Sequence, residues 1–508
     1  MKQRYYVLLP AVLLFALVAF CSLGDLQAQT IVNVPQGVGT LNQAIDGDTT
    51  ATGARNDSST VYVLERDGIY ILEGTIENNG YPLTIMAAEG EGERPKLIPG
   101  VATGGESERP FTPRGDLTLK GLYVTNEDEL AGIGTRIVRI RADSVKIRID
   151  DCHLDKDGQS AFRLDNAGIS ISITNSIVSN IRFDWDNGRG FDDRGNNIDS
   201  LVVENTTWYN LGSRVLRDGG GYINYARFNQ NTFVNMGRRV AEFGECVEVI
   251  FTNNQIVNCG FLGKDTTSTD GLLQIANLTN EDLTGLTQSI EIHNNNAYLD
   301  PAYSDVYPDS IIAQPMFDSL GAELVLTAGT GDDLLNEEII FTNAPVPNPD
   351  DITDWYANPN STEDFPDMDV AGEPFDFEYP ETTDSYTGSS NGEPLGHLHW
   401  FDIVSSVSIF DDAVPTSFEL LGNYPNPFNP TTNIVYALPK ASLVTLTIYN
   451  VNGQEIQTLV LNEVQNAGEH TVQWNGQDTR GVKVSSGIYL YRLQTDDFVR
   501  TNKMLMLK

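Results

Sequence analysis

The chain has 508 residues, of which 70 are acidic and 32 basic, so its formal net charge is −38 at pH 7. A surface this acidic repels nucleic acid and anionic lipid, and we expect no nucleic-acid partner. Residues 417–508 hold seven charges of each sign, so the excess negative charge lies upstream of them. Three interpretations of that charge remain open: solubility in a saline habitat, calcium binding, or an acidic partner-binding face.

Residues 1–28 have the features of a secretory signal. Lys2 and Arg4 precede an apolar run from Tyr5 to Phe20, and the small residue Ala28 precedes the expected cleavage point. No later apolar run reaches the ~20 residues that a membrane span needs, so we expect no transmembrane segment in the mature chain. The mature protein is therefore expected to be exported.

An eight-residue phrase recurs six times between Ile149 and Leu299. Its copies begin at Ile149, Ile173, Val203, Phe228, Phe251 and Ile292. Position one is always large and apolar, and position six reads Leu154, Val178, Trp208, Phe233, Ile256 and, more weakly, Ala297. Both positions are expected to face a core, yet residues of opposite parity point to opposite faces of a flat strand. The chain is therefore predicted to turn a corner between them.

Position three supplies that corner. It reads Asp151, Asn175, Asn205, Gln230, Asn253 and Asn294. Short amides tolerate left-handed backbone angles, and amides stacked ~4.8 Å apart can bond from coil to coil. A leucine-rich solenoid is the alternative, but the phrase is rich in Val, Ile and Phe, and the stretches between copies lack helical periodicity. The repeat therefore predicts a parallel β-helix.

The repeats, together with the opening segment Gly37–Ile45, resemble the right-handed β-helix proteins of the pectate-lyase-like superfamily over about residues 31–400. Leu41, Ala44 and Ile45 have helical spacing and predict a helix that caps the first coil. The resemblance is one of architecture and carries no catalytic signature.

The C-terminal segment changes character at about Ser417. The alternating runs Val444–Asn450 and Ser486–Arg492 predict the short strands of a small β-sandwich. The Asn-Pro-rich run Asn423–Pro430, the Ser486–Tyr489 strand and the closing Lys503–Lys508 resemble the C-terminal sorting domain of type IX secretion cargo. This resemblance implies the type IX secretion machinery as a partner and delivery to the cell surface of a Gram-negative bacterium. An ordinary immunoglobulin-like accessory domain is the alternative.

The predicted fold is thus all-β, a right-handed single-stranded parallel β-helix followed by a small immunoglobulin-like β-sandwich. The expected domain boundaries are residues 1–28 for the signal peptide, 29–405 for the β-helix, 406–416 for a linker and 417–508 for the sorting domain.

Basic residues follow position eight in consecutive copies of the phrase. They are Arg182, Arg214, Arg217, Arg238, Arg239 and Lys264, and acids such as Asp184, Asp186 and Asp218 accompany them. If the coils stack in register, these cations form a column along one flank. Guanidinium groups beside carboxylates suit an acidic sugar polymer. A ladder of surface salt bridges, each contributing ~0–1 kcal/mol, is the alternative.

The β-helix polysaccharide lyases that the chain resembles cleave uronic acid polymers by β-elimination. By their position in the column alone, Arg217, Arg239 and Lys264 are the candidate catalytic residues, either as the base or as the clamp on the carboxylate. Arg182, Arg214, Arg238 and Trp185 are the candidate substrate-binding residues, and Asp184, Asp186 and Asp218 are the candidate ligands of a calcium ion. Replacing Arg217 or Arg239 with Ala is expected to weaken binding of anionic glycans and to leave folding intact.

Three other features carry weaker signals. The odd set Cys152, Cys246 and Cys259 leaves at least one free thiol, and a Cys246–Cys259 bridge is an open option. His397 and His399 have a spacing that can bind a metal from one strand face, but Gly392–Trp400 resembles the segments that close the last coil of secreted solenoids, and we favour that structural role. A hydrolase would need a carboxylate pair, and Asp150-Asp151 falls at ladder positions instead.

The expected function is that of a secreted or cell-surface β-helix protein that binds an extracellular, uronate-containing polysaccharide, with cleavage by β-elimination as its enzymatic extension. A noncatalytic adhesin or structural solenoid is the rival class, because folds of this type host both.

Overall fold

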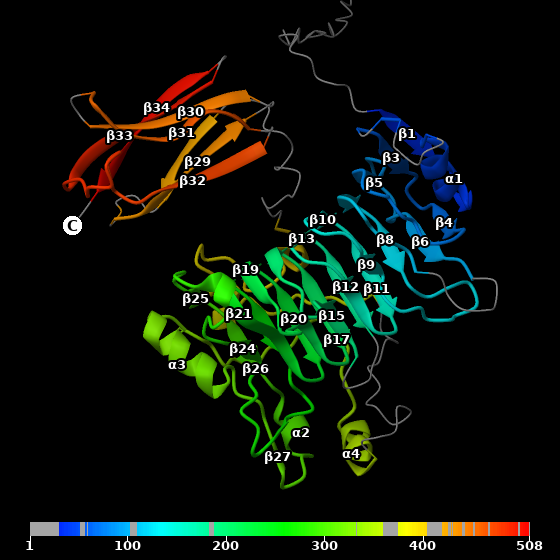
Figure 1. Cartoon of the computed structure of the whole chain (residues 1–508). Coiled ribbons are helices and arrows are strands. Elements are labelled where there is room, and N and C mark those ends of the chain that lie inside the picture. The colour runs from blue at the N-terminus through cyan, green and yellow to red at the C-terminus, as the bar shows by residue number, and fades with distance from the viewer. Residues whose placement is uncertain are drawn as a thin grey trace, which may run out of the picture.

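The computed structural model describes residues 30–50, 56–57, 59–101, 109–181, 187–331, 333–358, 374–403 and, with short gaps, 419–506. Parallel strands stack coil upon coil from the blue to the green part of the chain in Figure 1. Antiparallel strands, orange and red in Figure 1, make up the C-terminal unit. The predicted fold class, a parallel β-helix followed by a small β-sandwich, is confirmed. Within the described ranges, no helix is both long and apolar enough to span a bilayer.

Each coil contributes strands to as many as three parallel sheets. The first sheet contains β1 (Ile31–Val34), β3 (Val61–Leu64), β5 (Leu83–Ala87), β7 (Leu117–Lys120), β10 (Lys146–Asp150), β13 (Ile169–Thr174), β16 (Ile198–Glu204), β19 (Tyr222–Asn229), part of β21 (Arg239–Thr252) and β25 (Ser289–His293). The second contains β2 (Gly37–Val38), β4 (Ile69–Leu72), β6 (Lys96–Pro99), β8 (Tyr123–Thr125), β11 (His153–Asp157), β14 (Ile177–Ile181), β17 (Thr207–Leu211), β20 (Thr232–Met236), β22 (Gln255–Val257) and β26 (Asn296–Tyr298). The third contains β9 (Val138–Ile140), β12 (Ser160–Leu164), β15 (Arg189–Asp192), β18 (Arg214–Arg217) and β24 (Leu273–Ile275). The long strand β21 joins this third sheet to the first, since it pairs with β18 at its start and with β19 further along.

The repeated phrase crosses the corner between the first and second sheets. Position-one residues pair with one another along the first sheet from Ile149 to Ile292. Position-six residues pair in the same way along the second sheet from Leu154 to Ala297. Apart from the half-buried Ala297, all of them are at most 1% exposed, so both positions line the core as predicted.

Position three forms the corner, as the sequence predicts. Left-handed φ angles of 50° to 60° occur at Asp151, Asn175, Asn205, Gln230, Asn253 and Asn294. Position eight forms a second left-handed corner that the sequence analysis missed, at Lys156, Asn180, Asn210, Asn235 and Asn258. Asparagine recurs at both corners because its short amide tolerates the left-handed region.

The continuous ladder of amide bonds lies at position four rather than at position three. Asn231 Nδ2 donates to Asn254 Oδ1 over 3.0 Å, and Asn254 Nδ2 donates to Asn295 Oδ1 over 2.9 Å. The same amides donate to the position-one carbonyls of the preceding coil, such as Phe228 O. These carbonyls lie beside the left-handed corner, and the buried amides supply the donors that buried backbone groups need.

At position three the coil-to-coil contacts are mixed. Asn205 Nδ2 donates to Asn175 Oδ1 over 2.8 Å, as predicted. Asn175 and Asn253 instead donate to position-two residues of the preceding coil, Asp150 and Asn229. Amides therefore do bond from coil to coil as predicted. Along most of the corner, however, the bonded residues stand at position four and not at position three.

Short elements close and flank the β-helix. The predicted entrance helix is α1 (Thr40–Gly47), which buries Leu41 and Ile45 and contacts β1 and β4. The remaining elements before the C-terminal unit are β23 (Lys264–Asp265), η1 (Glu281–Leu283), α2 (Pro301–Ser304), β27 (Ile311–Ile312), α3 (Ser319–Ala328), α4 (Pro349–Ala357), η2 (Asp384–Thr387) and η3 (Leu398–Phe401). Strands β23 and β27 form a small antiparallel pair of their own.

Residues 374–403, which we call the return segment, run back along the β-helix toward its N-terminal coils. Gly388 O accepts from Asn294, Gly396 N donates to Asn253 O, and Leu398 N donates to Asn205 Oδ1. Aromatic residues Phe375 and Phe377 of this segment pack on the outer face of the second sheet. The expectation that the Gly392–Trp400 phrase closes the last coil is therefore wrong, because its amide and hydroxyl partners lie on the middle coils.

The C-terminal unit is built from two antiparallel sheets. One contains β28 (Glu419–Tyr424), β29 (Thr432–Leu438) and β32 (Gly468–Trp474). The other contains β30 (Ser442–Asn450), β31 (Glu455–Gln465), β33 (Gly487–Gln494) and β34 (Val499–Met506). Trp474, Tyr436 and Leu446 lie in a core that draws on both sheets.

Cys152, Cys246 and Cys259 are all free and buried, so the Cys246–Cys259 bridge does not form. Burial raises the pKa of each thiol to about 12, which makes these cysteines small apolar core residues.

Candidate functional site

The predicted cation column lies mostly on the third sheet, where it divides into two rows. Arg189, Arg214 and Arg239 pair side by side on β15, β18 and β21. Arg217 belongs to the neighbouring row, in which it pairs with Asp192. Arg189 belongs to this column although it was not among the predicted site residues.

Buried carboxylates neutralise the column. Glu242 Oε1 accepts from Arg239 Nη1 over 2.6 Å and also from Arg214 Nη1. Arg239 Nη2 lies 2.6 Å from Asp270, and Arg217 Nη1 lies 2.9 Å from Asp192. Arg239 is 4% exposed and Glu242 7%, so the ion pairs of Arg214 and Arg239 with Glu242 stand inside the wall of the β-helix, whereas Arg217 is half-buried. Burial lowers the pKa of Arg214 to about 10, which still leaves it protonated at neutral pH.

Of the other predicted site residues that the structure describes, Arg238 and Asp218 adjoin the column, where Asp218 N donates to Glu242 Oε2 over 3.1 Å, whereas Lys264 belongs to another sheet. Arg182, Asp184, Trp185 and Asp186 lie outside the described residues. Lys264 lies on β23, away from the third sheet, and its Nζ donates to Ser268 O over 2.7 Å. Arg238 is half-buried directly before β21, and Asp218 is exposed directly after β18. Within the described ranges, no group of three or more His, Cys, Asp or Glu residues could hold a metal ion.

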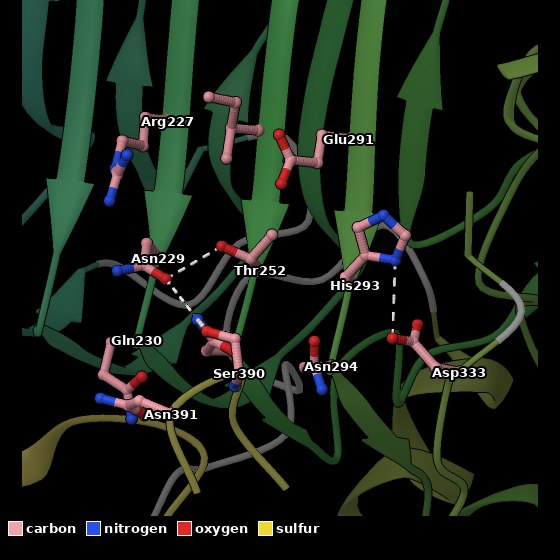
Figure 2. A pocket seen from close by; sticks show the side chains of 12 residues that line it. Arg227, Asn229, Gln230, Thr252, Glu291, His293, Asn294, Asp333, Ser390 and Asn391 are labelled. Atoms are coloured by element: carbon pink, nitrogen blue, oxygen red, sulfur yellow. Dashed lines mark hydrogen bonds and ion pairs between the residues drawn. The ribbon is translucent and has the colours of Figure 1, made fainter. Parts of the chain in front are cut away.

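A polar pocket of about 450 Å³ lies over the C-terminal end of the first sheet. Figure 2 shows Asn229, Thr252 and His293 in a row across neighbouring strands, with Asp333 beside His293. His293 Nδ1 lies 3.5 Å from Asp333 Oδ2, and Thr252 Oγ1 donates to Asn229 Oδ1 over 2.9 Å. The side chains in this pocket are largely engaged with one another.

A larger groove, of about 720 Å³, lies over the outer face of the second sheet, and we call it the aromatic groove. Its floor is formed by successive strand residues, including Ile69, Lys96, Tyr123 and His153, and one wall by Phe375 and Trp400 of the return segment. Tyr123, His153 and Trp400 are half-buried, whereas Lys96 is exposed. Two cations, Arg94 and Lys96, and two acids, Asp67 and Glu93, line it, so the groove is neutral on a strongly acidic chain.

A polar network fixes His153 on the floor of this groove. Ser179 Oγ donates to Asp155 Oδ1 over 2.7 Å and lies 2.7 Å from His153 Nε2. Because the hydroxyl proton goes to Asp155, His153 Nε2–H must donate to Ser179, which leaves Nδ1 as an acceptor. Burial lowers the pKa of His153 to about 4, so the ring is neutral at pH 7. Ser179 is therefore held as a donor to Asp155, not activated as a nucleophile.

A second pocket of about 390 Å³, which we call the corner pocket, adjoins the aromatic groove and shares Arg94, Ile177 and His399 with it. Asp151, His397 and Asp402 are among its other lining residues. Arg94 holds Asp151 through an Nη2 to Oδ1 contact of 2.6 Å. The rings of His397 and His399 are 5.5 Å apart, on a 3-10 turn rather than on one strand face, and they form no metal cluster with the described residues around them.

The aromatic groove could not be predicted from the sequence, for two reasons. Its floor runs along position five of the phrase, at His153 and Ile177. The residue type at position five varies from copy to copy, so no pattern marks it in the sequence. Its wall comes from residues some 200 positions further along, and only the Gly392–Trp400 phrase signalled that this segment was unusual.

Comparison with known proteins identifies a similar family for the C-terminal unit alone. The model of the FlgD Ig-like domain family matches residues 429–497. Among solved structures, PorZ, described as an essential surface component of the type-IX secretion system of Porphyromonas gingivalis, aligns at 17% identity and a TM-score of 0.14. That alignment covers 20% of this chain and 13% of PorZ, so it carries no argument about function. No curated protein sequence matches the chain. Residues 429–497 are thus similar to FlgD Ig-like domains, in keeping with their two-sheet sandwich.

Proposed function

We propose that this protein is a cell-surface β-helix that binds an extracellular polysaccharide in the aromatic groove. The supporting observation is the composition of that groove, where the rings of Tyr123 and Trp400 stand beside the cations Arg94 and Lys96. Aromatic faces pack on sugar rings, and Lys or Arg binds the carboxylates of uronate units. Elsewhere the high negative charge of the chain would repel a uronate polymer.

Surface delivery is part of the proposal. The C-terminal unit is an Ig-like sandwich, and its Asn-Pro-rich opening and basic end resemble the sorting domains of type IX secretion cargo. We assign it that role, with the secretion machinery as its partner and residues 1–28 as the first export signal.

Cleavage by β-elimination is the second candidate function, and His153 favours it. A neutral imidazole on the groove floor, with Nδ1 as its acceptor nitrogen, can take a proton from a sugar carbon, although its lowered pKa of about 4 makes it a weak base. Arg214, Arg217 and Arg239 are each engaged in ion pairs with carboxylates, so they fit the role of the base poorly. The buried ion pairs of this column favour its structural role. Calcium stays a prediction for this second candidate, since two of its three candidate ligands, Asp184 and Asp186, lie outside the described residues.

Retention of the full chain on immobilised polysaccharides tests the binding proposal. We expect retention on uronate polymers at low salt and its loss at high salt, because the carboxylate contacts are screened. Absence of retention on every uronate polymer would contradict the proposal. Ultraviolet absorbance of unsaturated uronate products, with and without calcium, then separates a lyase from a binding protein.

A further inference from the structure

The floor of the aromatic groove is part of a longer column of side chains. Each residue of this column precedes a core residue on its strand and therefore points outward. The residues pair from strand to strand, so the column runs along the axis of the β-helix. In order, they are Ile69, Lys96, Tyr123, His153, Ile177, Thr207, Thr232 and Gln255. The residues from Ile69 to Ile177 line the groove, whereas those from Thr207 onward do not. The groove therefore ends between Ile177 and Thr207.

The exposure of the side chains falls along this column toward the C-terminal coils. Ile69 is 49% exposed, and Gln36, whose side chain accepts from Ile69 N, is exposed as well. Ile177 is 9% exposed and Thr207 0%. Because all members of the column point away from the core, the buried ones must be covered from outside the sheet.

The return segment supplies this cover. Trp400 Nε1 donates to Thr207 Oγ1 over 2.7 Å, and His397 N donates to Thr232 Oγ1 over 2.9 Å. The segment therefore rests directly on the column beyond Ile177. A sugar chain on the floor of the groove cannot pass between the two, since both bonds are at direct hydrogen-bonding distance.

The groove is also bounded along its sides. Phe375 and Phe377 form one side, where each ring lies 5.4 Å from the ring of Tyr209. On the other side, Arg94 Nη2 lies 2.6 Å from Asp151 Oδ1 at the corner. A linear chain that lies along the floor can therefore extend toward the N-terminal coils, whereas the return segment stops it at the other end.

We propose that the aromatic groove binds the end of a linear polysaccharide chain rather than its interior. The terminal units lie over His153 and Ile177, against Trp400, and the chain leaves the groove over Lys96 and Ile69. This inference rests on the proposed binding of a uronate-containing polysaccharide in the same groove. Neighbouring strands are ~4.8 Å apart, so the floor from Ile69 to Ile177 is about 19 Å long and holds roughly four sugar units of an extended chain.

Titration of the full chain with polymers of graded length tests the proposal. The probes are linear polygalacturonate, polymannuronate and polyguluronate, each separated into short, intermediate and long fractions that all exceed the length of the floor. A linear chain has one reducing and one non-reducing end at any length, and a groove with two different ends accepts only one of them. Binding at chain ends is therefore independent of chain length, whereas binding in the interior is not.

We expect calorimetry to give a single bound protein molecule per chain in every fraction of the polymer that binds. The affinity per mole of chain should rise with length up to roughly four units, where the floor is filled, and then stay constant within about twofold. A number of bound molecules that grows in proportion to chain length would overturn binding at the chain end.

The same titrations on Lys96→Ala, with Lys146→Ala as the matched control, separate this inference from the proposed function. Both lysines are exposed strand residues, and only Lys96 lines the groove. If molecules bind all along the chain and Lys96→Ala weakens them, the chain-end inference is refuted and the groove stands as the binding site. If a single molecule binds per chain and both variants bind like wild type, the chain end is bound elsewhere and the groove is refuted. If none of the polymers binds, the groove is refuted together with its chain-end selectivity.

Discussion

His397 Nδ1 and Thr207 Oγ1 lie 2.9 Å apart although 190 residues separate them in the sequence. The same hydroxyl accepts from Trp400, so the buried side chain of Thr207 holds the return segment on the second sheet through two contacts. This docking creates both the wall of the aromatic groove and the corner pocket.

Thr207→Val removes the hydroxyl and keeps the shape of the side chain. We expect the free energy of unfolding to fall by about 2 kcal/mol, because His397 and Trp400 each lose a buried partner. Urea denaturation measures the loss, and limited proteolysis should cut the return segment first. Thr118→Val, on the half-buried outer face of β7, is the control and should change stability by less than ~0.5 kcal/mol. Equal effects of the two variants would show that Thr207 does not anchor the segment.

Asn254 is the central residue of the position-four ladder, with contacts to Asn231, Asn295 and Phe228 O. Asn254→Ala leaves several buried groups without partners, and we expect a loss of about 3 kcal/mol in unfolding free energy. Asn224→Ala, on the exposed face of β19, should have little effect. A loss in Asn254→Ala no larger than in Asn224→Ala would mean that water replaces the ladder.

Arg217 and Arg239 are expected to differ, although the sequence predicted that either could be replaced without affecting the fold. Arg239→Ala leaves Glu242 and Asp270 short of a buried cation and should cost about 3–5 kcal/mol of stability. Arg217 is about 30% exposed in its side chain, so Arg217→Ala should cost about 1 kcal/mol. Thermal unfolding of both variants checks this order, and an unchanged midpoint in Arg239→Ala would disprove the structural role of the column.

The raised pKa of Asp157 predicts that the stability of the fold depends on pH. Burial raises the pKa of its carboxyl to about 7, although Asn126 Nδ2 and two backbone amides donate to it. Between pH 4 and 7 the folded chain therefore holds a proton there that the unfolded chain has lost, and this group contributes less stability as pH rises, by up to ~1.4 kcal/mol per unit.

Asp157→Asn should remove that slope because an Asn side chain does not titrate. The buried Asn126 Oδ1, which has no hydrogen-bond partner among the described residues, can accept from the new amide if the Asn126 side chain turns over. The difference in unfolding free energy between the variant and wild type should grow in favour of the variant from pH 4 to 7. Asp199→Asn, on the exposed face, should run parallel to wild type. A variant curve parallel to wild type would contradict the raised pKa.

The sequence predicts the coils well because one residue type must recur where every coil turns. The left-handed φ at position three, from Asp151 in the first copy to Asn294 in the last, follows from the recurring short amides and acids. The core at positions one and six follows from the recurring large apolar residues. The return segment could not be predicted in the same way. Its docking depends on long-range contacts such as Leu398 N to Asn205 Oδ1, and nothing periodic marks those partners.

The cation column shows a second limit on what can be predicted from the sequence. Register along the sequence placed Arg214 and Arg239 side by side, as the structure has them, but it gave no information on depth. The acids that pair with these arginines, Glu242 and Asp270, lie on β21 and on the next coil. The same spacing of arginines is therefore compatible with an exposed binding surface and with a buried ion-pair network.

The most direct test of polysaccharide binding in the aromatic groove is calorimetric titration of a retained uronate polymer into Lys96→Ala and Lys146→Ala. Both lysines are exposed strand residues, but Lys96 lines the groove on the second sheet, whereas Lys146 lies on the first. We predict about fivefold weaker binding for Lys96→Ala, the loss of roughly one kcal/mol for a charge contact, and wild-type binding for Lys146→Ala. Equal affinities in the two variants would contradict the placement of the polysaccharide in this groove.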